Sequence, residues 1–278
     1  MRYAQLVVGP AGSGKSTYCS TMVQHAETEN KTIHVINLDP AAEYFDYSPI
    51  ADIRELIHLD DAMEDDEMRF GPNGGLIFCM EYLLENIPWL KEQIGEDDDD
   101  YILFDCPGQI ELFTHMDTMK KFVEFLKTEN FMICSVFLVD SQFMVDGAKF
   151  LSGTMTALSV MINLELPHVN LLSKIDLISK SSKKQIESYL EPDPHILLSE
   201  INTGSRWSEK YTKLTEALGK IIEDFSLVRF YPLNIKDEEN VADIFFTINN
   251  IIQYGEDADV KAKDIDLHPD EDGEDSFG

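Results

Sequence analysis

Short apolar runs alternate with segments of helical spacing along most of the chain. The runs are rich in Val, Ile, Leu and Phe, as expected for strands that are covered on both faces of a parallel sheet. They lie at residues 3–8, 33–38, 101–105, 133–139, 169–172 and 228–232. Between them apolar residues recur on one helical face, for instance at Val241, Ile244, Phe245, Ile248 and Ile252. This alternation predicts a doubly wound α/β fold, with a mostly parallel sheet and helices on both faces.

Two regions depart from that pattern. Residues 40–75 form a long insertion after the second strand, with a short helix predicted at 50–57 and an acidic run at 60–67. Residues 255–278 hold 10 acidic side chains and few apolar ones, too few to offset the entropy of ordering, and are expected to be disordered. The acidic run 97–100 is expected to be a solvated loop. The sequence therefore predicts one domain over residues 1–254, followed by an acidic tail.

Composition and charge narrow the classes of function. The chain has 278 residues, and 44% are hydrophobic, enough to fill a large core. With 52 acidic against 22 basic side chains the formal net charge is −30, which disfavours direct binding to nucleic acid or to an anionic membrane. There is no signal-peptide pattern and no run near 18 apolar residues, so a soluble, cytoplasmic protein is expected. The four cysteines are far apart in the chain and are expected to be buried thiols.

The strongest motif is a phosphate-binding loop. Residues 9–16 read Gly-Pro-Ala-Gly-Ser-Gly-Lys-Ser, a full match to G-x-x-x-x-G-K-[ST] between a strand and a helix. Its glycines let successive N–H groups turn toward the α- and β-phosphates, Lys15 should reach the β- and γ-phosphates, and Ser16 should ligate Mg²⁺. A glycine-rich turn without a ligand is the alternative, which the flanking strand and helix disfavour. The residues expected at the nucleotide are Gly12, Ser13, Gly14, Lys15, Ser16 and Thr17.

Two acidic motifs follow apolar strands. Asp105 ends the strand at 101–105, where a carboxylate can hold the Mg²⁺ shell. In the same motif Gly108 can give an N–H near the γ-phosphate, and Gln109 and Glu111 can orient an attacking water. Asp39 would lie near the phosphates if the second strand is beside the first. It could instead cap a helix that begins at Pro40.

A base-binding motif is expected after the fifth strand, at residues 171–176. The carboxylate of Asp176 could accept from guanine N1–H and its exocyclic amine together, while the stem of Lys174 packs over the base. An ordinary exposed Lys and Asp is an equally good interpretation of the tetrapeptide alone. Within the insertion, Gly71, Pro72 and Asn73 look like a turn that leads into a helix from Leu76.

Taken in order, these motifs resemble the GPN-loop GTPases. The resemblance rests on the phosphate loop, Asn-Leu-Asp-Pro-Ala-Ala-Glu at 37–43, Gly-Pro-Asn at 71–73 and Asp-Cys-Pro-Gly-Gln-Ile-Glu at 105–111, and covers residues 3–254. The longer strings at 69–76 and 137–144 are most similar to the third of the three eukaryotic paralogues. One departure is Ser173, which stands where the usual guanine motif begins with Asn and gives a shorter tether.

The resemblance implies a Mg²⁺-dependent GTPase of the SIMIBI-like P-loop class that binds GTP and GDP. It implies a dimer, either a homodimer or a heterodimer with the first paralogue, in which the Gly-Pro-Asn loop reaches the partner's phosphates. RNA polymerase II subunits would be the clients, with roles in assembly and nuclear import, and the protein could shuttle to the nucleus. By the same resemblance Asp39, Gln109 and Glu111 position water, Asn73 acts in trans, Asp105 and Ser16 hold Mg²⁺, and Ser173, Pro232 and Asn234 line the base site.

Three other functions are compatible with a phosphate-binding loop. A P-loop kinase usually clamps its substrates with several arginines, but the five here are not clustered. ATPases of the MinD or nitrogenase-iron-protein type need an early lysine in the loop, whereas positions 10–13 are Pro, Ala, Gly and Ser. A GTP-binding assembly scaffold with little hydrolysis of its own remains open. In that case the acidic insertion and tail could be partner surfaces, although such charge runs are more often only solvated.

Overall fold

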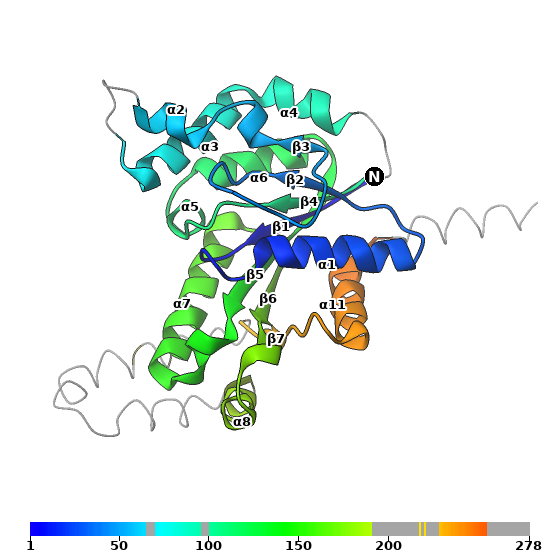
Figure 1. The fold of residues 1–278 in the computed structure, drawn as a ribbon, viewed down its shortest axis with the longest axis vertical. Helices are drawn as coiled ribbons and strands as arrows, with labels where there is room; N and C mark the ends of the chain where they lie inside the picture. Colours follow the sequence, from blue (N-terminus) through cyan, green and yellow to red (C-terminus); the bar gives the residue numbers. More distant parts are fainter. Residues whose placement is uncertain (65–69, 96–99, 191–216, 218–219, 221–227, 255–278) are drawn as a thin grey trace, which may run out of the picture.

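The computed structural model describes residues 1–64, 70–95, 100–190 and 228–254, together with Ala217 and Lys220. Within them, seven parallel strands form a single sheet in the order β3-β2-β4-β1-β5-β6-β7, and helices cover both faces (Figure 1). The strands are β1 (Arg2–Val8), β2 (His34–Asn37), β3 (Ala51–Asp52), β4 (Tyr101–Asp105), β5 (Phe131–Asp140), β6 (His168–Ser173) and β7 (Phe230–Pro232). The doubly wound fold expected from the alternating pattern is confirmed.

Helices surround the sheet in the expected alternation. The α-helices are α1 (Lys15–Thr28), α2 (Leu59–Glu64), α3 (Pro72–Glu85), α4 (Ile87–Ile94), α5 (Glu111–Thr114), α6 (Thr118–Thr128), α7 (Gly147–Leu164), α8 (Lys180–Leu190) and α11 (Glu238–Ile251). Short 3₁₀ turns are η1 (Ile53–Glu55), η2 (Ser141–Val145) and η3 (Ile175–Leu177). No described helix combines the length and the apolar character needed to cross a membrane.

The core has one layer on each side of the sheet. Because side chains alternate along a strand, Leu6 and Val8 of β1 face the layer built with α3 to α8, whereas Val7 faces α1 and α11. The five apolar residues predicted to share one helical face, from Val241 to Ile252, are all buried in the layer on the α1 and α11 side of the sheet. All four cysteines are buried and free.

The insertion differs from expectation in two places. The helix predicted at 50–57 is wrong: Ala51 and Asp52 pair with β2 as strand β3, and only one 3₁₀ turn follows. The turn predicted at Gly-Pro-Asn is also wrong, because α3 begins at Pro72 rather than at Leu76. Proline suits the first position of a helix, where its fixed φ is helical and its missing N–H is not needed.

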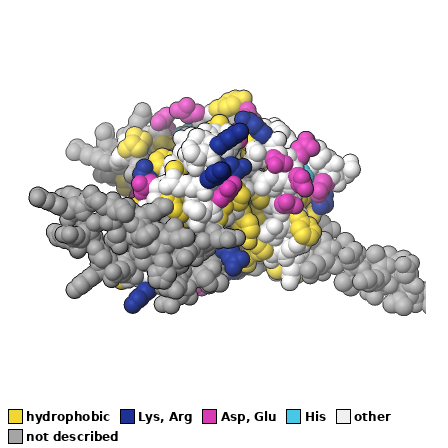
Figure 2. Space-filling model, turned by 90° about the horizontal axis from the view of Figure 1, so that it is seen from below, with side chains coloured by type: hydrophobic (Ala, Val, Ile, Leu, Met, Phe, Trp, Pro, Cys, Tyr) yellow, Lys and Arg dark blue, Asp and Glu magenta, His cyan; other side chains and the backbone are white. Residues whose placement is uncertain are grey.

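The described residues include only part of the acidic segments. The expected disorder of residues 255–278 and most of the run 97–100 lie outside the described residues. Asp100 is described, and its carboxylate pairs with Arg2 at 3.0 Å with 16% of the side chain exposed, so this residue is not the solvated loop position expected. On the face shown in Figure 2, acidic side chains occur in separate groups with basic and apolar ones between them.

His168 is a half-buried titratable group outside the candidate site. His168 opens β6, both ring nitrogens are shielded from solvent, and the ring stacks on Phe137 with 6.1 Å between centroids. Burial lowers the pKa of His168 to about 4, and the Asn170 side chain opposes this only in part. The folded protein therefore holds a neutral imidazole at pH values where the unfolded chain would be protonated.

We expect His168 to make the protein less stable in mild acid. Its stabilising contribution is present above the unfolded pKa of about 6.5 and is lost as the pH falls toward 4, since the unfolded state then binds the extra proton. Between pH 7 and 5 this amounts to about 2 kcal/mol. Denaturant melts at several pH values should show a flatter profile for His168→Phe. An unchanged slope in that variant would contradict the assignment.

Candidate functional site

A cavity of about 600 Å³ opens at the carboxyl ends of the central strands. This is the edge of a parallel sheet where ligands bind in doubly wound folds. Ten residues predicted from the sequence line it: Gly12, Gly14, Lys15, Ser16, Thr17, Asp39, Asn73, Gly108, Gln109 and Lys174. The fold thus brings together motifs that are up to 162 residues apart in the chain.

The phosphate loop has the backbone that its glycines predict. Gly9, Gly12 and Gly14 have φ values of 147°, 73° and 93°, which other residues rarely adopt. A Cβ on Gly9 would also lie 2.3 Å from the Leu138 carbonyl oxygen. Helix α1 starts directly after the loop with no side-chain cap and no acidic residue in its first turn. Its free N–H groups and positive end therefore face the cavity and suit an anion.

Lys15 is held at the loop. Its side chain is mostly buried, and Nζ donates to the Pro10 carbonyl at 3.3 Å across the turn. The ammonium therefore lies over the cradle formed by the glycines, next to the carboxylates of Asp39 and Asp105, whose pKa values it acts to lower.

Asp105 lies at the end of β4, beside β1 and the phosphate loop. Its carboxylate is almost completely buried. Oδ2 accepts from the Tyr47 hydroxyl at 2.7 Å, whereas Oδ1 is shielded and has no hydrogen-bond partner of good geometry among the described residues. Burial raises the pKa of Asp105, and the hydroxyls of Ser16 and Tyr47 and the charge of Lys15 oppose that rise.

These donors fit a magnesium ion. Mg²⁺ prefers hard oxygen ligands and is usually bound by one or two protein oxygens, water and substrate phosphate. Oδ1 of Asp105, which has no well-aligned hydrogen bond among the described residues, and the neighbouring Ser16 hydroxyl offer that chemistry. No cluster of three or more His, Cys, Asp or Glu side chains that could hold a metal by itself occurs in the described ranges. The site therefore suits an ion that is bound together with a nucleotide.

Asp39 lines the cavity, although strand β2 has a different neighbour in the sheet from the one that the sequence analysis assumed. Strand β2 pairs with β4 and not with β1, so the arrangement on which its placement depended is wrong. Asp39 nevertheless lines the cavity, because it follows β2 at the same edge. Its Oδ1 accepts from the Ala41 N–H at 2.9 Å, which closes a turn; the helix that the alternative required does not form. Burial raises the pKa of Asp39.

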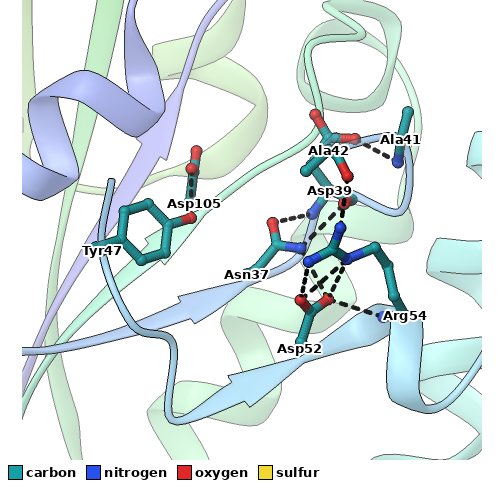
Figure 3. A network of polar contacts seen from close by, with 8 residues as sticks. All are labelled: Asn37, Asp39, Ala41, Ala42, Tyr47, Asp52, Arg54 and Asp105. Atoms are coloured by element: carbon teal, nitrogen blue, oxygen red, sulfur yellow. Dashed lines mark hydrogen bonds and ion pairs between the residues drawn. The ribbon is translucent and has the colours of Figure 1, made fainter. Parts of the chain in front are cut away.

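A polar network fixes the segment around Asp39 (Figure 3). The Asn37 amide binds both the N–H and the carbonyl of Asp39 at 3.1 Å, and donates to Asp52 at 2.9 Å. The Arg54 guanidinium binds the Asp52 carboxylate through Nε, which is 3.0 Å from both oxygens, and through Nη2, which is 2.5 Å from Oδ2. Its Nη1 donates to the Ala42 carbonyl at 2.7 Å. The network ties the end of β2, β3 and the loop after Asp39 into one unit.

The loop after β4 packs tightly on the phosphate loop. A Cβ on Gly108 would lie 2.8 Å from the Ala11 Cα, so only glycine fits at this distance. Gln109 is buried, lines the cavity and has a shielded Oε1 without a partner among the described residues. Glu111 is exposed at the start of α5 and does not line the cavity. Its role in orienting water stays a prediction.

The guanine motif is joined to the phosphate loop. The Ser173 hydroxyl donates to the Ser13 carbonyl at 2.6 Å, so the short side chain does form a tether. Lys174, at a φ of 59°, donates to the Gly12 carbonyl at 2.6 Å and to Asp140 at 2.8 Å. Ser13 itself is buried, and only its backbone is engaged here.

Asp176 lies outside the cavity lining, on the side of β7. Its carboxylate pairs with Lys236 at 2.7 Å. The loop that follows β7 carries Asn234, whose Oδ1 accepts from the Lys236 N–H at 3.1 Å. Pro232, the last residue of β7, accepts from the Asn240 amide through its carbonyl. The two loops expected to contact the base therefore meet at one place, although neither Asp176 nor Asn234 reaches the cavity.

The Gly-Pro-Asn tripeptide lies at the cavity of its own chain. Gly71 is the extended N-cap of α3, Pro72 is its first residue, and the exposed Asn73 lines the cavity. The resemblance implied contact with a partner's phosphates instead. Contact with phosphates in the protein's own site and contact with the partner's phosphates can be distinguished by mixing subunits.

The sequence analysis did not predict several residues that make polar contacts in this region. They are Tyr47, Asp52, Arg54, Asp140 and Lys236. No local motif marks them, because each acts through a contact that only the folded chain creates, such as the bond between Tyr47 and Asp105.

Comparison with known proteins gives close relatives. A family model described as a conserved hypothetical ATP binding protein matches residues 7–254. The chain is 56% identical to GPN-loop GTPase 3 of Danio rerio, over 99% of this chain and 97% of that protein. It is 50% identical to GPN-loop GTPase 3 of Mycosarcoma maydis, over 95% and 97%. An apo crystal structure of a GTPase from Pyrococcus abyssi shares the fold, with a TM-score of 0.71 and 24% identity over 90% of this chain and 97% of that one.

Proposed function

Because the chain belongs to the GPN-loop GTPase family, we propose that the cavity at the carboxyl edge of its sheet binds GTP with Mg²⁺ and hydrolyses it to GDP and phosphate. One observation carries the proposal: the phosphate loop, Asp39 and Gln109 line one cavity of about 600 Å³, and Asp105 lies beside Lys15 and Ser16 of that lining. That volume suits a small-molecule ligand.

Each group has a distinct chemical task in this proposal. The N–H groups of the loop and the first turn of α1 hold the phosphates, and the Lys15 ammonium lies over the β- and γ-phosphates. Ser16 and Asp105 hold the ion, which when bound would offset the negative charge on the phosphate oxygens during transfer. Gln109 and Asp39, both in the cavity lining, orient the attacking water. Gly108 presents its N–H to the γ-phosphate.

A kinase is a poorer fit to the cavity. Of the arginines that the structure describes, Arg2 pairs with Asp100 and Arg54 with Asp52, and Arg229 is likewise absent from the cavity lining. These three described arginines therefore provide no clamp for a second phosphorylated substrate. A scaffold that binds GTP but scarcely hydrolyses it would use the same residues for binding, so only kinetics separates it from an enzyme.

The cellular role is proposed on the family alone. By this proposal the chain pairs with the first family paralogue or with itself and assists assembly and nuclear import of RNA polymerase II. It would act in the cytoplasm and shuttle to the nucleus. Neither direct nucleic-acid binding nor membrane binding is proposed, in keeping with a net charge of −30.

Single-turnover hydrolysis tests the enzymatic proposal. We expect GTP bound in stoichiometric amount to be converted to GDP, and Gln109→Ala to slow this step while leaving GTP affinity close to that of the wild type. The reaction should be run with and without the first paralogue, since a partner could complete the site. Absence of turnover in both conditions, with tight GTP binding, would favour the scaffold.

A separate prediction concerns Asn73. If Asn73 contacts phosphate, Asn73→Ala should slow hydrolysis by roughly 10- to 150-fold, the value of one hydrogen bond to a charged group. If it is only a position in the first turn of α3, the change should cost about 1 kcal/mol or less and leave hydrolysis unaltered. Asn86→Ala, at the other end of α3, is the matched control.

Mixing subunits then separates contact in cis from contact in trans. An Asn73→Ala subunit keeps its phosphate loop, and a Lys15→Ala subunit keeps its Asn73. Contact in trans predicts that the mixed dimer regains hydrolysis at the Lys15-intact site. Contact in cis, which the position of Asn73 at its own cavity allows, predicts no recovery on mixing.

A further inference from the structure

Tyr47 makes a contact with the candidate metal site that no motif marks. It lies in the loop between β2 and β3, 58 residues before Asp105 in the chain. Its hydroxyl donates to Asp105 Oδ2 at 2.7 Å (Figure 3). The other carboxylate oxygen, Oδ1, is the shielded one without a partner of good geometry among the described residues. The tyrosine therefore engages one oxygen of the carboxylate and leaves the other for a different ligand.

The Tyr47 ring is held from two sides. It packs against the apolar layer that includes α1, and it stacks on Phe45 with 4.6 Å between centroids and 6° between planes. Phe45 in turn lies under the Arg54 guanidinium, 5.0 Å from the ring centroid. Asp52 and the Ala42 carbonyl fix that guanidinium. A cation over a stacked aromatic pair restrains the phenol in one orientation.

We propose that Tyr47 is a positioning residue for magnesium: its hydroxyl fixes the Asp105 carboxylate so that Oδ1 faces the ion beside Ser16. The inference rests on the proposed Mg²⁺–GTP site. An ionised carboxylate has acceptor capacity on both oxygens, so a hydrogen bond to one leaves the other free to coordinate. Groups that orient a metal's ligands in this way commonly affect metal affinity by 10-fold or more. Phe45 stacks on the Tyr47 ring, and Arg54 packs on Phe45 and donates to the Ala42 carbonyl, so the position of Tyr47 is linked to the loop that carries Asp39.

The test measures how Mg²⁺ retains a nucleotide, not turnover. The dissociation rate of a fluorescent GDP analogue is followed while Mg²⁺ is titrated from an EDTA baseline. For Tyr47→Phe, which removes only the hydroxyl, we expect the Mg²⁺ concentration for half-maximal slowing to rise about 10-fold, with the EDTA rate unchanged. Tyr44→Phe is the matched control, because this nearby tyrosine is 81% exposed and should leave the midpoint unaltered.

Two further measurements keep the outcome decisive. A thermal melt checks that Tyr47→Phe is folded, and Phe45→Leu, which removes the stacking partner, should shift the Mg²⁺ midpoint in the same direction by a smaller factor. A Mg²⁺-dependent wild type with an unchanged or lower midpoint in Tyr47→Phe would overturn the assignment of Tyr47 alone. A wild type whose nucleotide release does not respond to Mg²⁺ would overturn the metal site and this inference together.

Discussion

Replacing Lys15 by alanine is expected to weaken GTP and GDP binding by roughly 10- to 150-fold. The reason is the loss of a charge-assisted contact to phosphate, worth about 1.5 to 3 kcal/mol. Lys15 is buried over the loop, and among the described residues its side chain donates one hydrogen bond, to the Pro10 carbonyl, which is long at 3.3 Å. Little intramolecular binding therefore competes with a phosphate. The loss should be larger for GTP than for GDP, because Lys15 is expected to reach the γ-phosphate as well.

Equilibrium titration with a fluorescent nucleotide measures this effect. Lys31→Ala is the matched control: Lys31 lies beyond the C-terminal end of α1 and pairs with Glu29 at 2.7 Å, far along the helix from the loop. It should bind nucleotide as the wild type does. A Lys15→Ala protein that melts normally and binds GTP with unchanged affinity would remove the phosphate loop from the proposed site.

The fold was predictable where local sequence determines structure. Strands such as β5 are apolar on both faces, because helices cover the sheet on either side, and that leaves a continuous signal in the sequence. Strand β3 left none, since it has two residues and exists only through its pairing with Ile36 and Asn37. The order of β2 and β4 was equally hidden, because strand neighbours depend on how the crossovers wind and not on the strands' own residues.

The same distinction applies to the site. The phosphate loop is contiguous, and its glycines are required by local backbone angles, so eight consecutive residues were enough to predict it. Tyr47 and Arg54 lie in the insertion, where nothing in the spacing connects them to Asp105 or Asp39. The pair formed by Lys236 and Asp176 depends on β6 and β7 being neighbours. The side chains that orient the predicted site residues could therefore not be identified from the sequence.

A single substitution at Asp176 should switch the preferred base from guanine to xanthine. In the unmodified protein its two carboxylate oxygens can accept from guanine N1–H and the exocyclic amine together. Asp176→Asn replaces one acceptor by a donor that opposes the guanine amine but suits the xanthine carbonyl. GTP affinity should fall by roughly 10- to 150-fold, and XTP should become the preferred ligand.

The structure adds a condition to this expectation. Asp176 is paired with Lys236 at 2.7 Å, and the lysine side chain is 68% exposed. The Asp176 side chain is only 13% exposed, so the ammonium is the solvent-facing member of the pair and the one that a base with two donors would have to displace. Asp243→Asn, an exposed position on α11, is the control for the loss of one charge and should keep GTP as the preferred nucleotide.

Competition between GTP, ATP and XTP decides the assignment, and it also bears on the family model whose description refers to ATP. If Asp176 recognises the base, the wild type selects GTP and only Asp176→Asn moves toward XTP. A wild type that binds ATP as well as GTP would mean that the carboxylate does not contact the base. Its contact with Lys236 would then be the whole of its role, joining the loop after β6 to the loop after β7.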